Sequence, residues 1–248
     1  MIDAISIAES AMLNDLYQLN VVSNNVANAT TPGFLRELAF AQSTDQALNE
    51  LSNSGTPIFV GTDERAAIPV IDKTLSLKAG SLRNTGNPLD LAIDSNGFFE
   101  VNTASGTAYT RRGDFSLERL GYLVNFRGDR VQSLGGDIRI LEQNPRINEA
   151  GVIFEGDKRI GQIKVVSFPD DTAFTRNEAG YLVPAGRRAS TVDDAASVRQ
   201  GHLQAANVDS ATEVLKLMEI RRHFQASSNV IKAYDSMINL AINDIGDF

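Results

Sequence analysis

Residues 210–245 read SATEVLKLMEIRRHFQASSNVIKAYDSMINLAINDI, and this stretch decides the fold. Its apolar side chains recur at alternating spacings of three and four residues, the heptad pattern of a helix that packs along a partner helix. The line consists of Leu217, Ile220, Phe224, Ile231, Tyr234, Ile238, Ala241 and Ile245, with Ser227 as the polar interruption. Neither Gly nor Pro occurs between Ala211 and Ile245, so the pattern predicts one long helix.

The partner predicted for this helix is the other end of the chain. The N-terminal segment has its own three-four apolar line, interrupted by Glu9 and Ser23 and formed by Ile2, Ile5, Met12, Leu16, Leu19 and Val26. An alternative is that the C-terminal helix lies on the body of the protein, but this arrangement would leave the N-terminal line unpaired. The heptad pattern therefore favours helix against helix.

The N-terminal helical pattern ends in an Asn-rich run. Pro32 disfavours helical backbone at Thr31, and Gly33 supplies the freedom that a turn needs. We expect a structured turn from Asn24 to Phe34 that redirects the chain. A second amphipathic stretch from Phe34 to about Leu51 is compatible with a new helix, and residues 53–57 have the composition of a linker.

The middle of the chain has a different pattern. From about Ile68 to Val198, short β-prone runs such as Phe98–Val101 alternate with Gly, Asn and Asp, and no long helical pattern separates them. The predicted class is α+β, with N- and C-terminal helices packed as a coiled-coil-like α-domain around a central all-β domain. The expected divisions are a discontinuous helical polymerisation domain at 1–36 and 206–248, an extended or helical linker at 37–79, and a β-rich outer domain at 80–205.

The bulk composition excludes several classes of function. The net charge is −8 and the pI is about 4.8, which disfavours a nucleic-acid partner or an anionic membrane surface. The absence of Cys excludes disulfides and thiolate metal sites. The first residues contain neither a basic leader nor a continuous apolar run, so no cleaved secretory signal is expected, and no stretch is apolar enough for a membrane span.

Catalytic chemistry has little support in the sequence. The two histidines, His202 and His223, have no metal-binding spacing, and His223 is expected in a solvated or interface role. Asp90 and Asp94 flank a short apolar run and are close enough in sequence to form a pair, although turn and strand-edge roles are commoner for Asp. No glycine pattern matches a phosphate cradle. We expect no enzyme, no catalytic residue, no metal, no cofactor and no small-molecule substrate.

The segment from Ser23 to Phe34, SNNVANATTPGF, resembles the signature that follows the first helix in the flagellar rod and hook family. Further motifs follow in the order of that family: NPLDLAI at 87–93, NGFFEV at 96–101, YTRRGDF at 109–115, GYLV at 121–124 and QAANV at 204–208. Val26 stands where Leu is usual. Pro88-Leu-Asp90 and Arg221-Arg-His-Phe224 are more similar to proximal than to distal rod members, whereas Gly97-Phe-Phe99 is more similar to distal rod and hook members.

The resemblance implies a structural subunit of the bacterial flagellar basal-body rod, placed in the rod across the periplasm after type III export from the cytoplasm. Its partners would be other copies of itself, other rod proteins and the export apparatus. The residues expected at the assembly interface are Ile5, Met12, Leu16, Leu19, Asn24, Asn25, Asn28, Leu217, Ile220, Phe224, Ile231, Tyr234 and Ile238. The rival hypothesis from another class is a β-rich adhesin or binding module with a concave site on its β body.

Overall fold

The structure is a computed structural model of the chain, and it describes residues 2–41, 71–141, 144–169, 172–184, 191–193 and 196–246. The described residues form two compact units. One, which we call the helical unit, comprises the described residues within 1–26, 37–73 and 209–248, and the other, the β unit, comprises those within 27–36 and 74–208. The expected linker at 53–57 lies outside the described residues.

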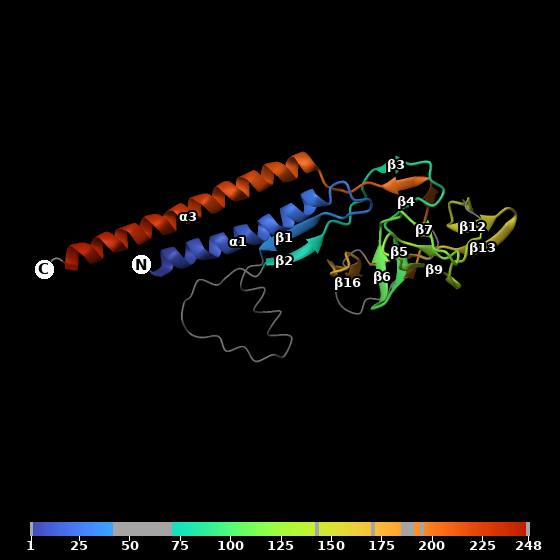
Figure 1. Cartoon of the computed structure of the whole chain (residues 1–248), viewed down its shortest axis with the longest axis horizontal. Coiled ribbons are helices and arrows are strands. Elements are labelled where there is room, and N and C mark those ends of the chain that lie inside the picture. Colours follow the sequence, from blue (N-terminus) through green and yellow to red (C-terminus); the bar gives the residue numbers. More distant parts are fainter. Residues whose placement is uncertain are drawn as a thin grey trace. The chain divides into compact units, whose positions relative to one another are not determined.

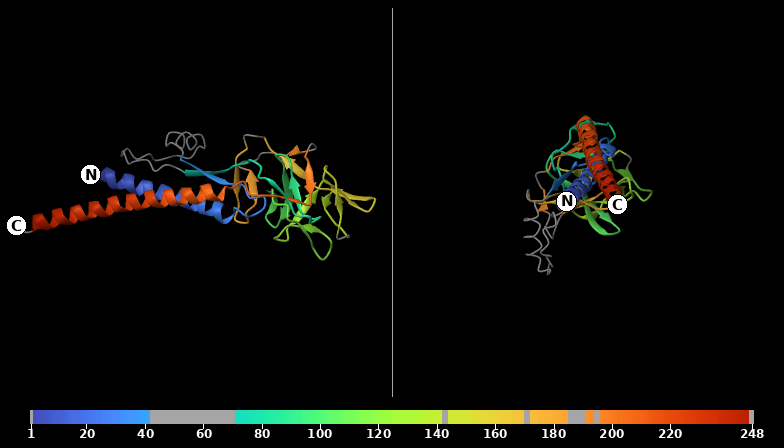
Figure 2. Two further views of the ribbon diagram at one scale, coloured as in Figure 1. Left: turned by 90° about the horizontal axis from the view of Figure 1, so that it is seen from above. Right: turned by 90° about the vertical axis from the view of Figure 1, so that its left-hand side faces the viewer.

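Two long helices dominate the helical unit. The 26-residue helix α1 (Ile2–Ala27) and the 37-residue helix α3 (Ser210–Gly246) run side by side (Figures 1 and 2). Contacts pair Asn25 with Glu213 and Asp15 with His223, so residue numbers rise along one helix as they fall along the other. The helices are therefore antiparallel, and the predicted α+β class with packed terminal helices is confirmed.

A small two-stranded sheet, β1 (Glu37–Ala41) and β2 (Ile71–Leu75), lies beside α1 (Figure 1). Of the extended and helical alternatives left open for the stretch after Phe34, residues 37–41 adopt the extended one. The partner strand lies some thirty residues further along the chain, and strand formation depends on such a partner more than on local preference. The remainder of that stretch lies outside the described residues.

Helix α1 ends later than the turn was expected to begin. Asn24 to Ala27 are still helical, and the turn starts at Asn28, whose backbone oxygen accepts a hydrogen bond from the Thr31 amide at 3.0 Å. Gly33 follows with a φ of 65°, and a Cβ added there would lie 2.4 Å from the backbone of Arg111. Position 33 thus requires glycine for two reasons, its left-handed backbone and the close approach of the backbone at Arg111.

Helix α3 starts at a side-chain cap. Asp209 accepts hydrogen bonds from the Ala211 amide at 3.1 Å, a backbone group that the first turn leaves unpaired, and from the Thr212 hydroxyl at 2.6 Å. The bond from Thr212, followed by that from Ala211, lowers the pKa of Asp209 below its ordinary value. The beginning of α3 is thus set by the residue just before it.

The β unit consists of antiparallel sheets. The largest sheet has ten described strands, in the order β15-β16-β6-β5-β9-β8-β7 with β10, β14 and β17 attached at its side. These strands are β5 (Phe98–Thr103), β6 (Gly106–Thr110), β7 (Ser116–Leu117), β8 (Leu123–Val124), β9 (Arg130–Ser133), β10 (Gly136–Asp137), β14 (Val165–Ser167), β15 (Phe174–Arg176), β16 (Leu182–Pro184) and β17 (Thr191–Val192). These described strands pair in antiparallel registers, and they form the all-β body that the short β-prone runs predicted.

Three smaller sheets complete this unit. They comprise β11 (Arg146–Ile147), β12 (Val152–Glu155) and β13 (Lys158–Gln162) in one, β4 (Leu91–Ile93) with β18 (Val198–Gln200) in another, and β3 (Leu82–Asn84) with β19 (His202–Gln204) in the last. Phe98 and Phe99 are both buried on β5 but belong to different clusters, because successive side chains of a strand point to opposite faces. The central strand therefore contributes to two cores.

Candidate assembly interface

The seam between α1 and α3 is the first candidate. On α3, Ile220 is buried, and Leu217, Phe224, Ile231 and Tyr234 are half-buried at the predicted three-four spacing. Ile238, further along the helix, is 42% exposed. The line of greatest burial therefore coincides with the predicted heptad line over Leu217 to Tyr234.

The side of α1 that is most buried differs from the predicted line. Ala8, Asp15 and Val22 are buried at intervals of seven residues, whereas Ile5, Met12 and Leu19 are half-buried and Leu16 is 49% exposed. The larger apolar residues of the predicted line therefore lie beside the most buried positions of α1 rather than at them. The apolar line predicted for α1 thus lies along the edge of the seam.

Asp15 and Glu213 are acidic residues inside this seam, and no pattern of apolar residues reveals them. Asp15 Oδ2 lies 2.7 Å from Nδ1 of His223, whose side chain is 63% exposed. Glu213 is 1% exposed, and Nζ of Lys216 lies 3.9 Å from its carboxylate. His223 thus lies at the exposed edge of the seam with the carboxylate of Asp15 as its partner, within the solvated or interface role expected from the sequence.

Asn25 joins three segments of the helical unit. Its Nδ2 donates to the backbone oxygen of Glu37 at 2.9 Å and to Oε2 of Glu213 at 3.2 Å, and its Oδ1 accepts from the amide of Glu37 at 2.8 Å. Asn25 is 1% exposed. One buried amide therefore connects α1, β1 and α3, which gives this residue of the signature a structural purpose.

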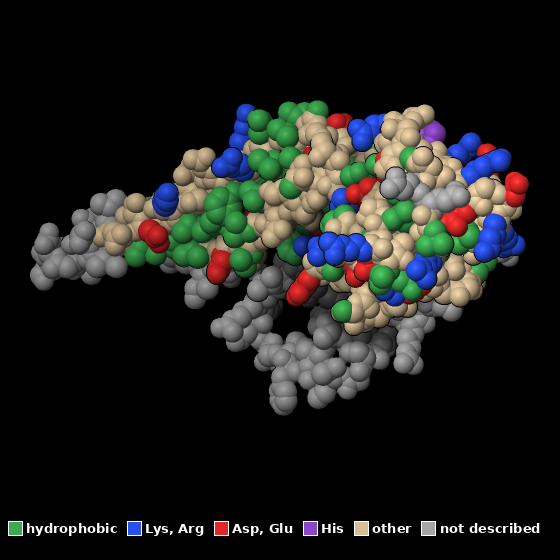
Figure 3. Space-filling view, turned by 45° about the vertical axis from the view of Figure 1, so that its right-hand side comes forward, with side chains coloured by type: hydrophobic (Ala, Val, Ile, Leu, Met, Phe, Trp, Pro, Cys, Tyr) green, Lys and Arg blue, Asp and Glu red, His purple; other side chains and the backbone are tan. Residues whose placement is uncertain are grey.

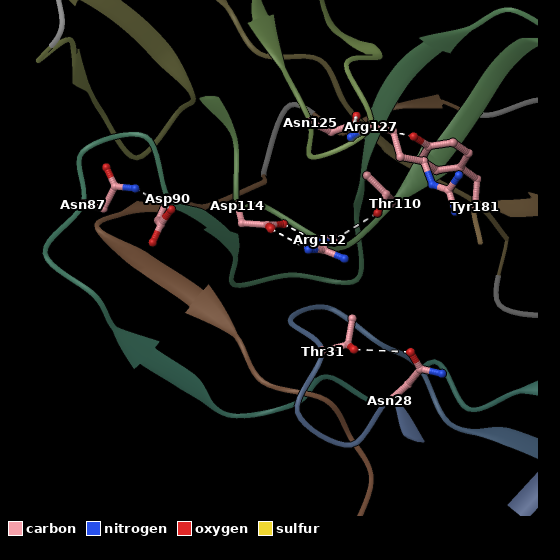
Figure 4. Close-up of polar contacts among 10 residues, drawn as sticks. All are labelled: Asn28, Thr31, Asn87, Asp90, Thr110, Arg112, Asp114, Asn125, Arg127 and Tyr181. Carbon is pink, nitrogen blue, oxygen red and sulfur yellow. Dashed lines mark hydrogen bonds and ion pairs between the residues drawn. The ribbon is translucent and has the colours of Figure 1, made fainter. Parts of the chain in front are cut away.

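Asn24 and Asn28, the other two Asn residues expected at the interface, are half-buried. The side chain of Asn28 accepts a hydrogen bond at 3.3 Å from the hydroxyl of Thr31, and thus serves the turn after α1 (Figure 4). Asn207 has a comparable role that the sequence reasoning missed. It accepts from the Arg36 amide at 2.6 Å and donates to the carbonyls of Ser76 and Lys78 at 2.8 and 2.7 Å.

A groove of about 490 Å³ runs along one side of the helix pair. Leu16 and Leu19 of α1 and Phe224 of α3 provide its apolar lining, while Arg221 and Lys232 provide two cations. Neither cation forms an ion pair with any residue in the described part of the chain. This surface is suited to a partner that brings apolar side chains and at least one carboxylate.

A second apolar surface lies on α3 away from the seam. Leu215, Val230 and Met237 are 67%, 57% and 59% exposed. Figure 3 shows hydrophobic side chains reaching the surface along the helices. Exposed apolar side chains that gather in this way typically mark a surface for another protein.

The motifs of the β unit make turns and hydrogen bonds rather than a reaction centre. Asn87 donates to Asp90 at 2.8 Å, and Arg112 pairs with Asp114 at 2.7 Å (Figure 4). Asn125 donates to the Tyr181 hydroxyl at 2.6 Å, and burial raises the pKa of Tyr181 to about 12. A phenol with a raised pKa stays neutral, and this hydroxyl accepts from Asn125 while it donates to the carboxylate of Asp129.

The acidic and histidine side chains considered as candidates for chemistry do not form a cluster. Asp90 is buried against Asn87, whereas Asp94 is contacted by Arg199 at 3.3 Å, so these two aspartates have separate partners. His202 lies on β19 with Nδ1 2.9 Å from the backbone oxygen of Gln200. Among the described residues, no group of three or more His, Asp or Glu side chains could hold a metal ion.

Three family models match the chain in succession. "Flagella basal body rod protein" matches residues 5–34, "Flagellar hook protein FlgE/F/G D1 domain" matches 92–155, and "Flagellar basal body rod FlgEFG protein C-terminal" matches 199–244. The first covers most of α1 and the turn, and the last covers β18, β19 and most of α3. The matches thus include both helices and much of the largest sheet.

Individual relatives are similar over nearly their whole length. A flagellar basal-body rod protein FlgF of Mesorhizobium japonicum is 29% identical, with 99% of each chain covered. A FlgG of Bacillus subtilis is 29% identical over 94% of this chain and 96% of its own. A FlgF of Caulobacter vibrioides is 27% identical, with 99% of each chain covered.

Proposed function

The chain belongs to the flagellar basal-body rod FlgE/F/G family, and from this premise we propose that its paired terminal helices are the element through which it polymerises. As a member of that family it is a structural subunit of the rod and not an enzyme. Because the chain belongs to this family, the rod subunit is preferred over the rival hypothesis of an adhesin. The described helices all lack the combination of length and apolar character required to cross a lipid bilayer.

One observation carries the proposal: the helix pair is closed on one seam and still exposes large apolar side chains elsewhere. Ile220 is buried, while Leu215 and Val230 on the same helix are 67% and 57% exposed. A chain that only needed to fold would gain nothing from this exposure. Repeated contacts between unlike surfaces build an open filament, which is the architecture that a rod requires.

The division of labour that we propose follows the expected boundaries. Residues 1–36 and 206–248 polymerise, residues 37–79 link, and residues 80–205 form an outer layer. The partners are further copies of the chain and other rod proteins, and the export apparatus delivers the subunit to the rod. Because polymerisation buries apolar helix surface between neighbours, it supplies the stiffness that torque transmission needs.

Within the family, we assign the chain to the proximal rod protein FlgF rather than to the distal FlgG. The support is the pair of motifs Pro88-Leu-Asp90 and Arg221-Arg-His-Phe224. The motif Gly97-Phe-Phe99 favours FlgG, and the two relatives at 29% identity include one of each kind. Complementation of strains that lack either protein distinguishes the two assignments, since only the FlgF-deficient strain should regain motility.

A deletion strain tests the proposed function. Without the protein, isolated basal bodies viewed by electron microscopy should lack the rod beyond the inner-membrane ring, and the wild-type gene should restore it. The His202→Asn variant serves as the control and should restore the rod equally well, because His202 is outside the helices. Complete rods in the deletion strain would refute the proposal.

A further inference from the structure

Helix α3 carries two apolar faces. Each residue of a helix is rotated by about 100° from the one before it, so the seam residues of α3 point in one common direction. A second set of residues is rotated roughly 130° away from that direction. This second set, the outer stripe, has spacings of three and four residues and consists of Leu215, Glu219, Arg222, Ala226, Val230, Ala233 and Met237. All seven side chains are exposed. A heptad-like line on this face indicates that another helix lies along it.

Helix α1 also presents a second face. Glu9, Leu13, Leu16 and Asn20, the outer face of α1, are exposed and lie roughly 120° around the helix from the buried line of Ala8, Asp15 and Val22. Leu13 and Leu16 are 48% and 49% exposed. Leu16 also lines the groove, so the outer face of α1 and the groove form one continuous surface.

The two surfaces lie on opposite sides of the helix pair. On α3, Arg221 and Lys232 of the groove lie roughly 95° from the seam in one rotational direction, and the outer stripe lies roughly 130° in the other. A subunit therefore has one apolar surface on each side. If these surfaces bind each other between copies, the contact is heterologous and leaves both ends open for the next copy.

Charge supports this pairing. The outer stripe carries one acid, Glu219, and one base, Arg222, while the receiving surface carries the acid Glu9 beside the bases Arg221 and Lys232. None of these five side chains makes an ion pair with another residue that the structure describes. Because each surface carries both acidic and basic side chains, a register that places opposite charges next to each other is more stable than other registers.

We propose that the outer stripe of α3 in one copy packs against the outer face of α1 and the adjoining groove in a second copy. This inference rests on the proposed function, because it specifies which surfaces join when the helices polymerise. The partner is another copy of this chain. Val230 of one copy and Leu13 of the other then lie on the two sides of the same interface.

The test is a mixing experiment with the full-length chain in sedimentation velocity. Val230→Asp blocks the outer stripe, and Leu13→Asp blocks the outer face of α1. Wild type should form concentration-dependent oligomers, and each variant alone should lose them. An equimolar mixture of the two variants should form a dimer of twice the monomer mass and nothing larger, because each variant retains the half that the other lacks.

Leu134→Asp is the matched control, because Leu134 is 50% exposed in the β unit and the chemical change is the same. It should assemble as wild type does. Circular dichroism checks that both helix variants keep wild-type helicity, and Val230→Lys and Leu13→Lys replace any variant that does not. Formation of the mixed dimer is itself evidence that both copies are folded.

Three results would overturn the proposal. Association of Leu13→Asp with itself would show that the outer stripe pairs with itself, and a mixture that stays monomeric would show that the two surfaces do not meet. A wild-type chain that stays monomeric at every concentration would assign both surfaces to a different rod protein. That last result would leave the proposed rod function intact, which the deletion strain tests separately.

Discussion

Asn25 in α1 and Glu213 in α3 are 188 positions apart in the chain, and the amide of one donates to the buried carboxylate of the other at 3.2 Å. The same amide holds the backbone of Glu37 by two further hydrogen bonds. A single side chain therefore fixes how the first helix, the strand after it and the last helix meet. The substitutions predicted below act on contacts that join distant parts of the chain or that begin and end its helices.

Asn25→Ala should destabilise the helical unit. The substitution leaves the Glu213 carboxylate and the Glu37 amide buried without these partners, and each such loss costs about 1–3 kcal/mol. Urea unfolding followed by circular dichroism measures the difference. Asn20→Ala, at an exposed position of the same helix, is the control and should change the free energy of unfolding by less than about 0.5 kcal/mol. Equal effects at the two positions would contradict the role given to Asn25.

Gly33→Ala should be more damaging than Gly86→Ala. Both glycines have a positive φ, 65° and 71°, so each substitution meets the same backbone penalty of about 1–2 kcal/mol. At Gly33 the new Cβ would also lie 2.4 Å from the backbone of Arg111, whereas at Gly86 nothing lies within 4 Å. Thermal unfolding of the two variants isolates the steric part. Indistinguishable melting temperatures would show that the close approach of the chain at Gly33 is unimportant.

The cap at Asp209 should make the helix pair sensitive to acid. Hydrogen bonds from Thr212 and Ala211 lower the pKa of Asp209 in the folded chain. Its contribution is therefore present above the unfolded pKa of about 3.9 and is lost as the pH falls through the lower folded value. Asp209→Ala should be less stable than wild type at neutral pH, and the difference should shrink in acid. A difference in stability that is independent of pH would contradict this account.

The sequence predicted α3 well because its seam is made of large side chains. Leu217, Ile220, Phe224, Ile231 and Tyr234 are visible as a heptad, and their burial follows that line. On α1 the most buried positions are Ala8, Asp15 and Val22, which a search for large apolar residues passes over. The position of the α1 seam depends on how closely the helices approach, and that distance is a property of the pair.

Other features depend on partners that a local pattern cannot identify. Glu37 to Ala41 form a strand because β2 pairs with it, not because the local composition excludes a helix. The outer stripe of α3 escaped notice because Glu219 and Arg222 interrupt its apolar pattern, although its three-four spacing is present in the sequence. Asn25 was recognised within a family signature, but its bond to Glu213 requires the folded chain.

The seam between the helices can be tested apart from the outer stripe, because Ile231 and Val230 are neighbours that face different partners. Ile231→Asp places a charge in the half-buried seam, where an unpaired carboxylate is costly. It should reduce helicity and separate α1 from α3 within one chain. Val230→Asp should change neither the helicity nor the contact between α1 and α3. Circular dichroism and limited proteolysis of the two purified variants distinguish these outcomes, and equal loss of helicity in both would refute the assignment of the two faces.

The most direct measurement of the central claim, that the terminal helices carry the function, is electron microscopy of basal bodies from cells whose only copy is Ile231→Asp. We expect cells that make and fold the β unit but are non-motile, with rods that stop where this subunit should join. Cells with His202→Asn should have complete rods and swim normally. Complete rods with Ile231→Asp, or lost motility with a folded His202→Asn protein, would contradict the account.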